Sequence, residues 1–200
     1  TGVMRGFDMV MVRVVDGDGA TGCGYTVMHE GFGGPIAATV RENFTPWTLQ
    51  QDPRRIEWIW RNLWRTHHYV GRGGAIAFAI AALDTALWDL RGNALGEPLW
   101  RLLGGYSPEV RAYAGNIDLN FPMDELLAGA SKSIDAGFKS IKMRLGKPTL
   151  DEDLDRVAAM RQHLGPKIEL MADANEAWRT DQAARALRAL GEFDLVWVEE

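Results

Sequence analysis

The chain has 200 residues, of which 46% are hydrophobic and 24% are charged, and its formal net charge is −5. These proportions are typical of globular proteins and exclude a disordered or fibrous chain. Lysine and arginine are interspersed with acidic residues and form no basic face, so we expect no nucleic-acid partner. The longest strictly apolar run, Ala75 to Leu83, has nine residues, which is too short to cross a bilayer.

The cysteine content and the start of the chain bear on the compartment. A single cysteine, Cys23, cannot form an internal disulfide, which is typical of proteins in a reducing cytoplasm. The chain starts at Thr1, and no positively charged segment leads into an apolar stretch, so we expect no signal peptide and a truncated start. We therefore expect a cytoplasmic protein without a membrane partner.

The first 35 residues have the pattern of a hairpin followed by a loop. Met9 to Val15 predicts a strand, and the Asp-Gly-Asp-Gly sequence at 16–19 is typical of a tight turn, so Thr21 to Met28 is the expected return strand. Glu30 to Pro35 is rich in glycine and is expected to form a loop. The Gly-Lys-Ser/Thr sequence of a phosphate-binding loop does not follow it.

Residues 36–104 are expected to be helical. Asp52-Pro53 has the pattern of a helix start, and apolar residues follow it at helical spacing. Residues 75–91 predict a second helix that is mostly buried, because very few of them are polar. Residues 98–103 predict a short last helix.

From Val110 onward, short apolar strands alternate with amphipathic helices. We expect strands at 110–114, 140–145, 168–172 and 195–199, and helices at about 123–136, 151–164 and 180–190. This alternation is typical of repeated βα units with a parallel sheet. The sequence therefore predicts an α+β region over residues 1–108 and a βα region over residues 109–200.

Charged side chains gather where the predicted strands end. Lys142 and Arg144 share one face of their strand because side chains alternate along a strand. By the same rule Asp173 and Asn175 share a face, and the next strand ends in Glu199-Glu200. In a βα barrel the carboxyl ends of the strands form the active-site face. Two cations, two acidic groups and an amide are thus expected on one rim.

These residue types suit a divalent cation and an anionic substrate. Mg²⁺ prefers oxygen ligands and leaves room for substrate oxygens. Arg144 can hold a carboxylate through its fork of donors, and Lys142 adds a compact charge. Charged residues also end strands simply because solvent begins there, but three successive strands with such ends favour a site. Taken alone, the residues predict metal-assisted chemistry on an anionic substrate.

Several motifs resemble the enolase superfamily, in its mandelate racemase and muconate lactonizing branch. The similar segments are Ala79–Asp89 with Gly92, Pro98 and Leu102–Gly105; Phe138–Gly146 with Asp151–Arg161; Asp173-Ala-Asn175; and Trp197-Val-Glu-Glu200. The spacings fit as well, with 31 residues from Lys142 to Asp173 and 26 from Asp173 to Glu199. The resemblance covers nearly the whole chain.

The resemblance implies an α/β fold with two domains. Residues 1–108 would form an α+β capping domain whose first strand is missing, and residues 109–200 the first half of a TIM-like, modified (β/α)7β barrel. A barrel needs about 250 residues, so we expect the chain to be part of a longer protein. An isolated half-barrel would expose two sheet edges, which predicts association or aggregation.

Roles for individual residues follow from the resemblance. Asp173 and Glu199 would be two of three Mg²⁺ ligands, whereas Glu200 would lie on the opposite face. Lys142 would polarise the substrate carboxylate, and Asn175 would lie near the substrate. His29, in the loop expected around Tyr25 to Gly34, would be a substrate contact.

Arg144 occupies the position where racemases of the family carry a lysine base. A guanidinium stays protonated in proteins and is a poor base. A one-sided reaction therefore fits better than racemisation: a base on the other face removes the proton α to a carboxylate, through a metal-stabilised enediolate, and a β-hydroxyl departs. The expected activity is Mg²⁺-dependent dehydration of a sugar acid to a 2-keto-3-deoxy acid.

Two alternatives remain open at this stage. One is a racemase, epimerase or cycloisomerase of the same superfamily. The other is a catalytically inert barrel with a binding or structural role. In either case the resemblance implies a homo-oligomer, and the third metal ligand and the general base would lie on later strands.

Overall fold

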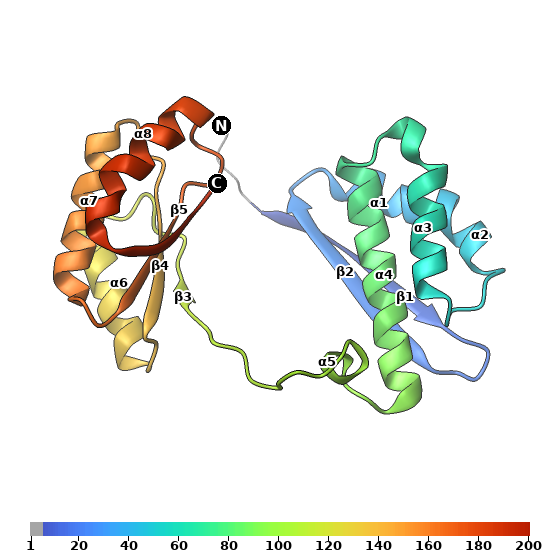
Figure 1. The fold of residues 1–200 in the computed structure, drawn as a ribbon. Coiled ribbons are helices and arrows are strands. Elements are labelled where there is room, and N and C mark those ends of the chain that lie inside the picture. Colours follow the sequence, from blue (N-terminus) through green and yellow to red (C-terminus); the bar gives the residue numbers. More distant parts are fainter. Residues whose placement is uncertain (1–5) are drawn as a thin grey trace. The chain divides into compact units, whose positions relative to one another are not determined.

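The structure is a computed structural model, and it describes residues 6–200. Residues 1–5, which belong to the expected capping domain, lie outside the described part. The chain consists of two compact units, Thr1–Pro108 and Glu109–Glu200 (Figure 1). Within the described residues, no helix combines the length and the apolar character needed to cross a membrane.

The first unit combines a hairpin with helices. Strands β1 (Phe7–Val15) and β2 (Thr21–His29) pair antiparallel, from Phe7 opposite His29 to Val15 opposite Thr21. The helical segments are α1 (Gly33–Ala38), the π-helix η1 (Thr39–Phe44), α2 (Thr45–Thr48), α3 (Ile56–Thr66), the 3₁₀-helix η2 (His68–Val70), α4 (Gly74–Leu95) and α5 (Leu99–Leu102).

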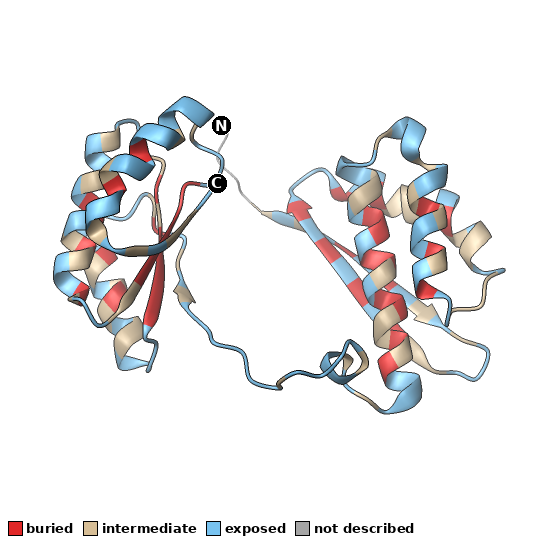
Figure 2. Cartoon of the chain, viewed as in Figure 1, coloured by how far each residue is buried: buried red, intermediate tan, exposed pale blue. Residues whose placement is uncertain are grey.

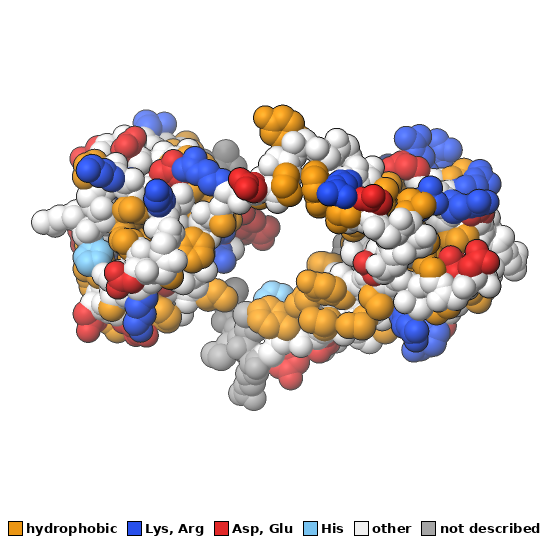
Figure 3. Space-filling model, turned by 90° about the horizontal axis from the view of Figure 1, so that it is seen from below, with side chains coloured by type: hydrophobic (Ala, Val, Ile, Leu, Met, Phe, Trp, Pro, Cys, Tyr) orange, Lys and Arg blue, Asp and Glu red, His pale blue; other side chains and the backbone are white. Residues whose placement is uncertain are grey.

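The core of the first unit lies between the hairpin and the helices. Val10, Val12 and Met28 are buried in one cluster with apolar residues of α3 and α4. Helix α4 lies so close to β2 that there is no room for a side chain at Gly22 or Gly24. On the other face of the hairpin, Phe7, Met9 and Met11 are exposed. Figure 3 shows hydrophobic side chains gathered at the surface of this unit.

Two expectations for the first unit are wrong in detail. Helix α3 begins at Ile56 and not after Asp52, because the Asp52 carboxylate binds the backbone N–H and the guanidinium of Arg54 and so closes a turn before the helix. The loop expected around Tyr25 to Gly34 is much shorter. Its first five residues belong to β2, and the turn before α1 is held by the Asp8 carboxylate, which accepts the N–H groups of Gly31 and Gly33.

The second unit is a four-stranded parallel sheet with helices. The strands are β3 (Ala114–Gly115), β4 (Ser140–Arg144), β5 (Glu169–Asp173) and β6 (Leu195–Glu199), and they lie side by side in chain order. The helical segments are α6 (Met123–Asp135), α7 (Leu150–Leu164), α8 (Thr180–Leu190) and the 3₁₀-helix η3 (Gly191–Phe193). Figure 1 shows α6, α7 and α8 on one face of this sheet.

Strand alternation separates the core of the second unit from its polar face. Ile141 and Met143 of β4 and Leu170 and Ala172 of β5 are fully buried in one cluster with helix residues. In Figure 2 the buried residues follow β4, β5 and the inner sides of the helices. The intervening side chains, among them Lys142, point to the other face.

The first strand of this unit is shorter than predicted. Residues 110–114 were expected to form it, but β3 pairs with β4 only at Ala114 and Gly115. Val110 is 89% exposed. A segment becomes a strand only where a neighbour completes its hydrogen bonds, and β4, which begins at Ser140, does not extend far enough to do so for residues 110–112.

Candidate functional site

The register of the parallel sheet brings the charged strand ends together. Arg144 lies opposite Asp173, and Asp173 lies opposite Glu199. Aligned residues on neighbouring strands are only about 4.8 Å apart in the hydrogen-bonding direction. Lys142 precedes Arg144 by two positions, so it shares the same face.

A bulge in β6 sets the position of Glu199. Leu170 pairs with Leu195, but Ala172 pairs with Val198, so β6 contains one extra residue between these two pairs. A bulge of this kind shifts the alternation of side chains by one. Leu195 and Val198 can therefore both pack on the helix-side core, while Glu199 lies on the face of Asp173.

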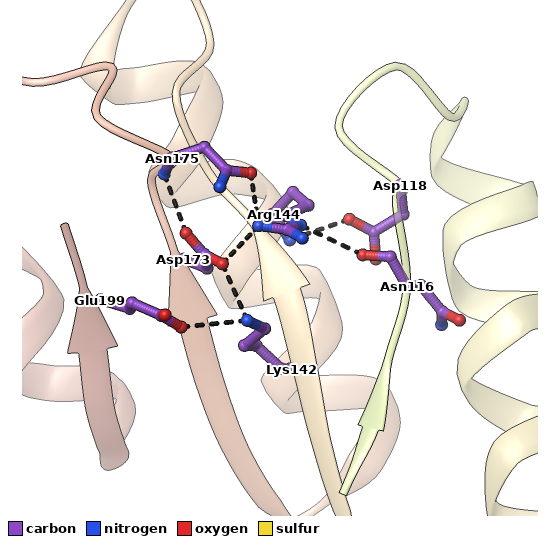
Figure 4. Close-up of polar contacts among 7 residues, drawn as sticks. All are labelled: Asn116, Asp118, Lys142, Arg144, Asp173, Asn175 and Glu199. Carbon is purple, nitrogen blue, oxygen red and sulfur yellow. Dashed lines mark hydrogen bonds and ion pairs between the residues drawn. The ribbon is translucent and has the colours of Figure 1, made fainter. Parts of the chain in front are cut away.

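Lys142 links the two carboxylates. Its ammonium nitrogen Nζ lies 2.8 Å from Oδ2 of Asp173 and 3.0 Å from Oε2 of Glu199 (Figure 4). The side chains of Lys142 and Asp173 are 11% and 3% exposed, whereas that of Glu199 is 45% exposed. The cluster therefore opens to solvent on the side of Glu199.

Hydrogen bonds and neighbouring charges favour the ionised forms of Lys142 and Asp173. Burial disfavours the charge on Lys142, but its hydrogen bonds to Asp173 and Glu199 outweigh this effect and raise the pKa of Lys142. Burial likewise disfavours the charge on Asp173, but hydrogen bonds from Lys142 and from the backbone N–H of Asn175, together with the charge of Arg144, lower the pKa of Asp173. A protonated Lys142 beside two carboxylates is a fixed positive charge rather than a base.

Arg144 extends the cluster toward two neighbouring segments. Its Nη1 donates hydrogen bonds to the side chains of Asp173 and Asn175, and its Nε donates to the backbone oxygen of Asn116 at 3.3 Å. Asn175 has a left-handed backbone with φ 48°, which asparagine tolerates better than most residues. Its N–H donates to Oδ1 of Asp173 at 2.9 Å. Asn175, two residues after the end of β5, thus braces Asp173.

The donor set fits a magnesium ion. Asp173 and Glu199 both direct a carboxylate oxygen at one cationic atom, the Nζ of Lys142, so the geometry already concentrates negative charge around a positive centre. Carboxylate oxygens are the ligands that Mg²⁺ prefers, commonly with only one or two of them from the protein. Among residues 6–200, no group of three or more acidic, histidine or cysteine side chains forms a complete metal site.

Five of the six predicted site residues are neighbours in the second unit: Lys142, Arg144, Asp173, Asn175 and Glu199. His29 lies in the first unit, at the end of β2, where its ring stacks on that of Phe7 at 6.5 Å between centroids. Its role as a substrate contact stays a prediction.

Sequence reasoning missed the segment after β3. Asp118 is buried, and its Oδ1 accepts the backbone N–H of Arg144 at 2.8 Å. Burial raises the pKa of Asp118, although the Arg144 N–H and the nearby Arg156 act in the opposite direction. The signal was present, because Asn116 and Asp118 follow the first predicted βα strand just as Asp173 and Asn175 follow a later one.

Two aromatic rings lie beside Lys142, one from Tyr113 just before β3 and one from Trp197 in β6. Its Nζ lies 5.7 Å from the ring centroid of Tyr113 and 5.7 Å from that of Trp197. These two rings meet edge to face with centroids 5.7 Å apart. Such rings attract an ammonium group and restrict its position.

Comparison with protein families matches both units. Residues 1–104 match the family model of the mandelate racemase / muconate lactonizing enzyme N-terminal domain. Residues 125–200 match the model of the enolase C-terminal domain-like family.

Individual relatives share this organisation. The chain is 48% identical over 199 residues to a 3,6-anhydro-alpha-L-galactonate cycloisomerase from Streptomyces coelicolor, covering 100% of the chain and 55% of the relative. It resembles the crystal structure of a racemase from Streptomyces coelicolor with bound magnesium, with a TM-score of 0.91, 47% identity, and 96% and 54% of the two chains covered.

A third match is the crystal structure of an L-talarate dehydratase from Polaromonas sp. JS666 complexed with Mg and L-glucarate. The TM-score is 0.87 at 35% identity, and the match covers 98% of this chain and 55% of that one. The chain thus spans about half the length of the relatives that it matches.

Proposed function

Because this chain belongs to the mandelate racemase and muconate lactonizing branch of the enolase superfamily, whose enzymes use Mg²⁺, we propose that the whole protein removes the proton α to the carboxylate of a sugar acid. In this fold an N-terminal capping domain precedes a C-terminal barrel. We assign residues 1–108 to the capping domain and residues 109–200 to the first half of the barrel. We further propose dehydration to a 2-keto-3-deoxy acid as the overall reaction.

The observation that carries this proposal is the register of Lys142, Asp173 and Glu199 on one face of the sheet. Asp173 and Glu199 would hold Mg²⁺, which when bound supplies positive charge beside the substrate carboxylate. Lys142 adds a fixed positive charge at the same place. Loss of an α-proton doubles the negative charge on the carboxylate group, so preorganised cations there lower the barrier.

The state of the two cationic side chains supports elimination over racemisation. Lys142 is tied to two carboxylates, and the side chain of Arg144 is a guanidinium, a group that is a poor base in proteins. Neither is suited to accept a proton, so this side of the substrate has no base among the cluster residues. Arg144, Asn175 and Lys142 would instead bind and orient the carboxylate, while a base from outside the cluster removes the proton.

Cycloisomerisation is a second candidate, favoured by the 48% identical cycloisomerase. The two reactions share the removal of the α-proton and differ in the oxygen that leaves carbon 3. In dehydration a hydroxyl leaves as water. In a 3,6-anhydro sugar acid the leaving oxygen belongs to a ring ether and stays attached at carbon 6, so the product has the mass of the substrate.

Mass spectrometry separates the two candidates. We would incubate the full-length protein and Mg²⁺ with galactarate, talarate and 3,6-anhydrogalactonate, and follow keto-acid formation. A product lighter than its substrate by one water identifies dehydration, and a keto-acid of unchanged mass identifies cycloisomerisation. No keto-acid from any member of a broad sugar-acid panel would contradict the proposal.

The metal role of Asp173 has its own test. Asp173→Asn should lower kcat/KM by more than about 100-fold, because even residues that only support metal ligands contribute 10- to 100-fold. Glu169→Gln is the matched control, since Glu169 lies on the same strand at its other end, and it should leave kcat/KM unchanged. An active Asp173→Asn variant with unchanged magnesium affinity would show that Asp173 does not hold the metal.

A further inference from the structure

The segment between β3 and α6 is fixed by two buried charged residues that take no direct part in the cluster. Asp118 is 2% exposed and lies in this segment, five residues before α6 begins at Met123. Its Oδ1 accepts the backbone N–H of Arg144 at 2.8 Å. This bond ties the segment to the last residue of β4.

Arg156, on α7, holds the same segment from the other side. Its Nη2 donates to the backbone oxygen of Asp118 at 2.9 Å, and its Nη1 donates to that of Phe121 at 3.1 Å. Its Nη2 also lies 3.9 Å from Oδ1 of Asp118. One planar guanidinium therefore clamps both ends of a four-residue turn, which is closed by a bond from the N–H of Phe121 to the oxygen of Asp118.

The Arg144 side chain lies between this segment and the proposed metal ligand. Its Nε binds the oxygen of Asn116, and its Nη1 binds Asp173 and Asn175 (Figure 4). Backbone and side chain of Arg144 are thus both anchored in residues 116–118. A displacement of this segment would move the guanidinium relative to Asp173.

The Asp118–Arg156 pair is poorly built for stability alone. Within residues 6–200, Oδ2 of Asp118 and Nε of Arg156 are buried and have no hydrogen-bond partner. Burying charged groups with unsatisfied atoms costs free energy, and apolar residues of similar size often stabilise a fold equally well. Retaining such a pair beside the site favours a role in geometry.

We propose that Asp118 and Arg156 are positioning residues that hold Arg144 in the orientation needed to bind the substrate carboxylate. The part that concerns substrate rests on the proposed function. The part that concerns the position of Arg144 rests only on the contacts above. Neither residue touches the reacting atoms, so both act through Arg144.

Variants of Asp118, Arg156 and Arg161 in the full-length protein test this proposal. Asp118→Ala removes the acceptor for the Arg144 N–H, whereas Asp118→Asn keeps an oxygen at Oδ1. Arg156→Met removes the clamp. Arg161→Met is the matched control: Arg161 lies on the same helix but donates to backbone oxygens that precede β5 and β6, namely those of Gly165, Ile168, Phe193 and Asp194.

Steady-state kinetics and crystal structures give the readouts. We expect Asp118→Ala and Arg156→Met to lower kcat/KM by about 10- to 100-fold, mainly through KM, and their crystal structures to show Arg144 turned away from Asp173. Asp118→Asn should retain most of the wild-type kcat/KM. Arg161→Met should lower the melting temperature without changing KM or the position of Arg144.

Unchanged KM and an unchanged Arg144 in Asp118→Ala and Arg156→Met would overturn the proposal, even if both variants melt earlier. If Asp118→Ala yields no folded protein, Arg156→Lys replaces it, since lysine keeps the charge but cannot span both carbonyl groups. If the wild-type protein turns over no sugar acid, the proposed function fails, and the position of Arg144 in the variant crystals still decides the positioning role.

Discussion

Two cations and two carboxylates meet in the cluster of Lys142, Arg144, Asp173 and Glu199, so its formal charge is zero. A neutral cluster is suited to bind Mg²⁺ together with the proposed anionic substrate. Their opposite charges partly cancel, so no large excess charge remains in this partly buried site. Asp173 is buried and Glu199 is partly exposed, so the cluster is shielded from solvent on one side and accessible to it on the other.

Glu169, at the opposite end of β5, is expected to make the stability of the fold depend on pH. Hydrogen bonds from Arg111 and Ser140 lower the pKa of Glu169. A carboxylate whose pKa is depressed in the folded state adds stability above its unfolded pKa of about 4.3, and this stability is lost as the pH falls through the folded value.

Glu169→Gln should therefore lower the free energy of unfolding at pH 7, and the difference from the wild-type protein should shrink below about pH 4. Urea denaturation at pH 7 and pH 3 measures it. The effect should be small, because Arg111 is mostly exposed. An equal difference at both pH values would show that the ion pair is not its cause.

Close packing between elements limits which residues β2 can carry. A Cβ at Gly24 would lie 2.1 Å from the backbone oxygen of Ala82 and 2.4 Å from the nitrogen of Ala86. One at Gly22 would lie 2.2 Å from both the oxygen of Ala86 and the nitrogen of Leu90. These neighbours are backbone atoms of α4, so the clash can be relieved only by moving the whole helix away from the hairpin.

Gly24→Ala should destabilise the first unit by about 3 kcal/mol, the upper end of the usual cost of overpacking. The control is Gly34→Ala in α1, where an added Cβ meets no atom within 4 Å and alanine favours the helix. Thermal unfolding of both variants measures the difference. A Gly24→Ala variant as stable as Gly34→Ala would mean that α4 does not lie as close to β2 as described.

For the whole molecule, the second unit has four parallel strands in an open order, from β3 to β6. An open parallel sheet exposes unpaired backbone groups at both edges, and its polar face has no second layer among the described residues. The relatives are nearly twice as long as this chain. A closed barrel would cover these edges and add further ligands around Asp173 and Glu199.

We therefore expect a purified protein of residues 1–200 alone to self-associate and to turn over no sugar acid, while the full-length protein is active with Mg²⁺. Size-exclusion chromatography and the keto-acid assay measure both properties. Full Mg²⁺-dependent activity of the 200-residue chain would contradict the proposed division of the site between the two halves of the barrel.

Local patterns in the sequence were sufficient for much of the fold. The hairpin, helix α7 and strands β4 to β6 lie within a few residues of their predicted positions, because alternation, helical spacing and capping act over short distances. The same short-range rule places Lys142 beside Arg144 on one strand face. The motifs along the chain also indicated the superfamily and the α/β fold, which the family comparisons confirm.

Only the tertiary structure decided how the strand ends meet. Continued from the pair Leu170–Leu195, strict alternation would place Glu199 on the helix side of the sheet, and the bulge in β6 is what aligns it with Asp173. The short β3 and the Asp118–Arg156 clamp were likewise not predicted. Bulges, strand lengths and buried charge pairs depend on the neighbouring strand or helix, and residues adjacent in space but distant in the chain leave no local pattern.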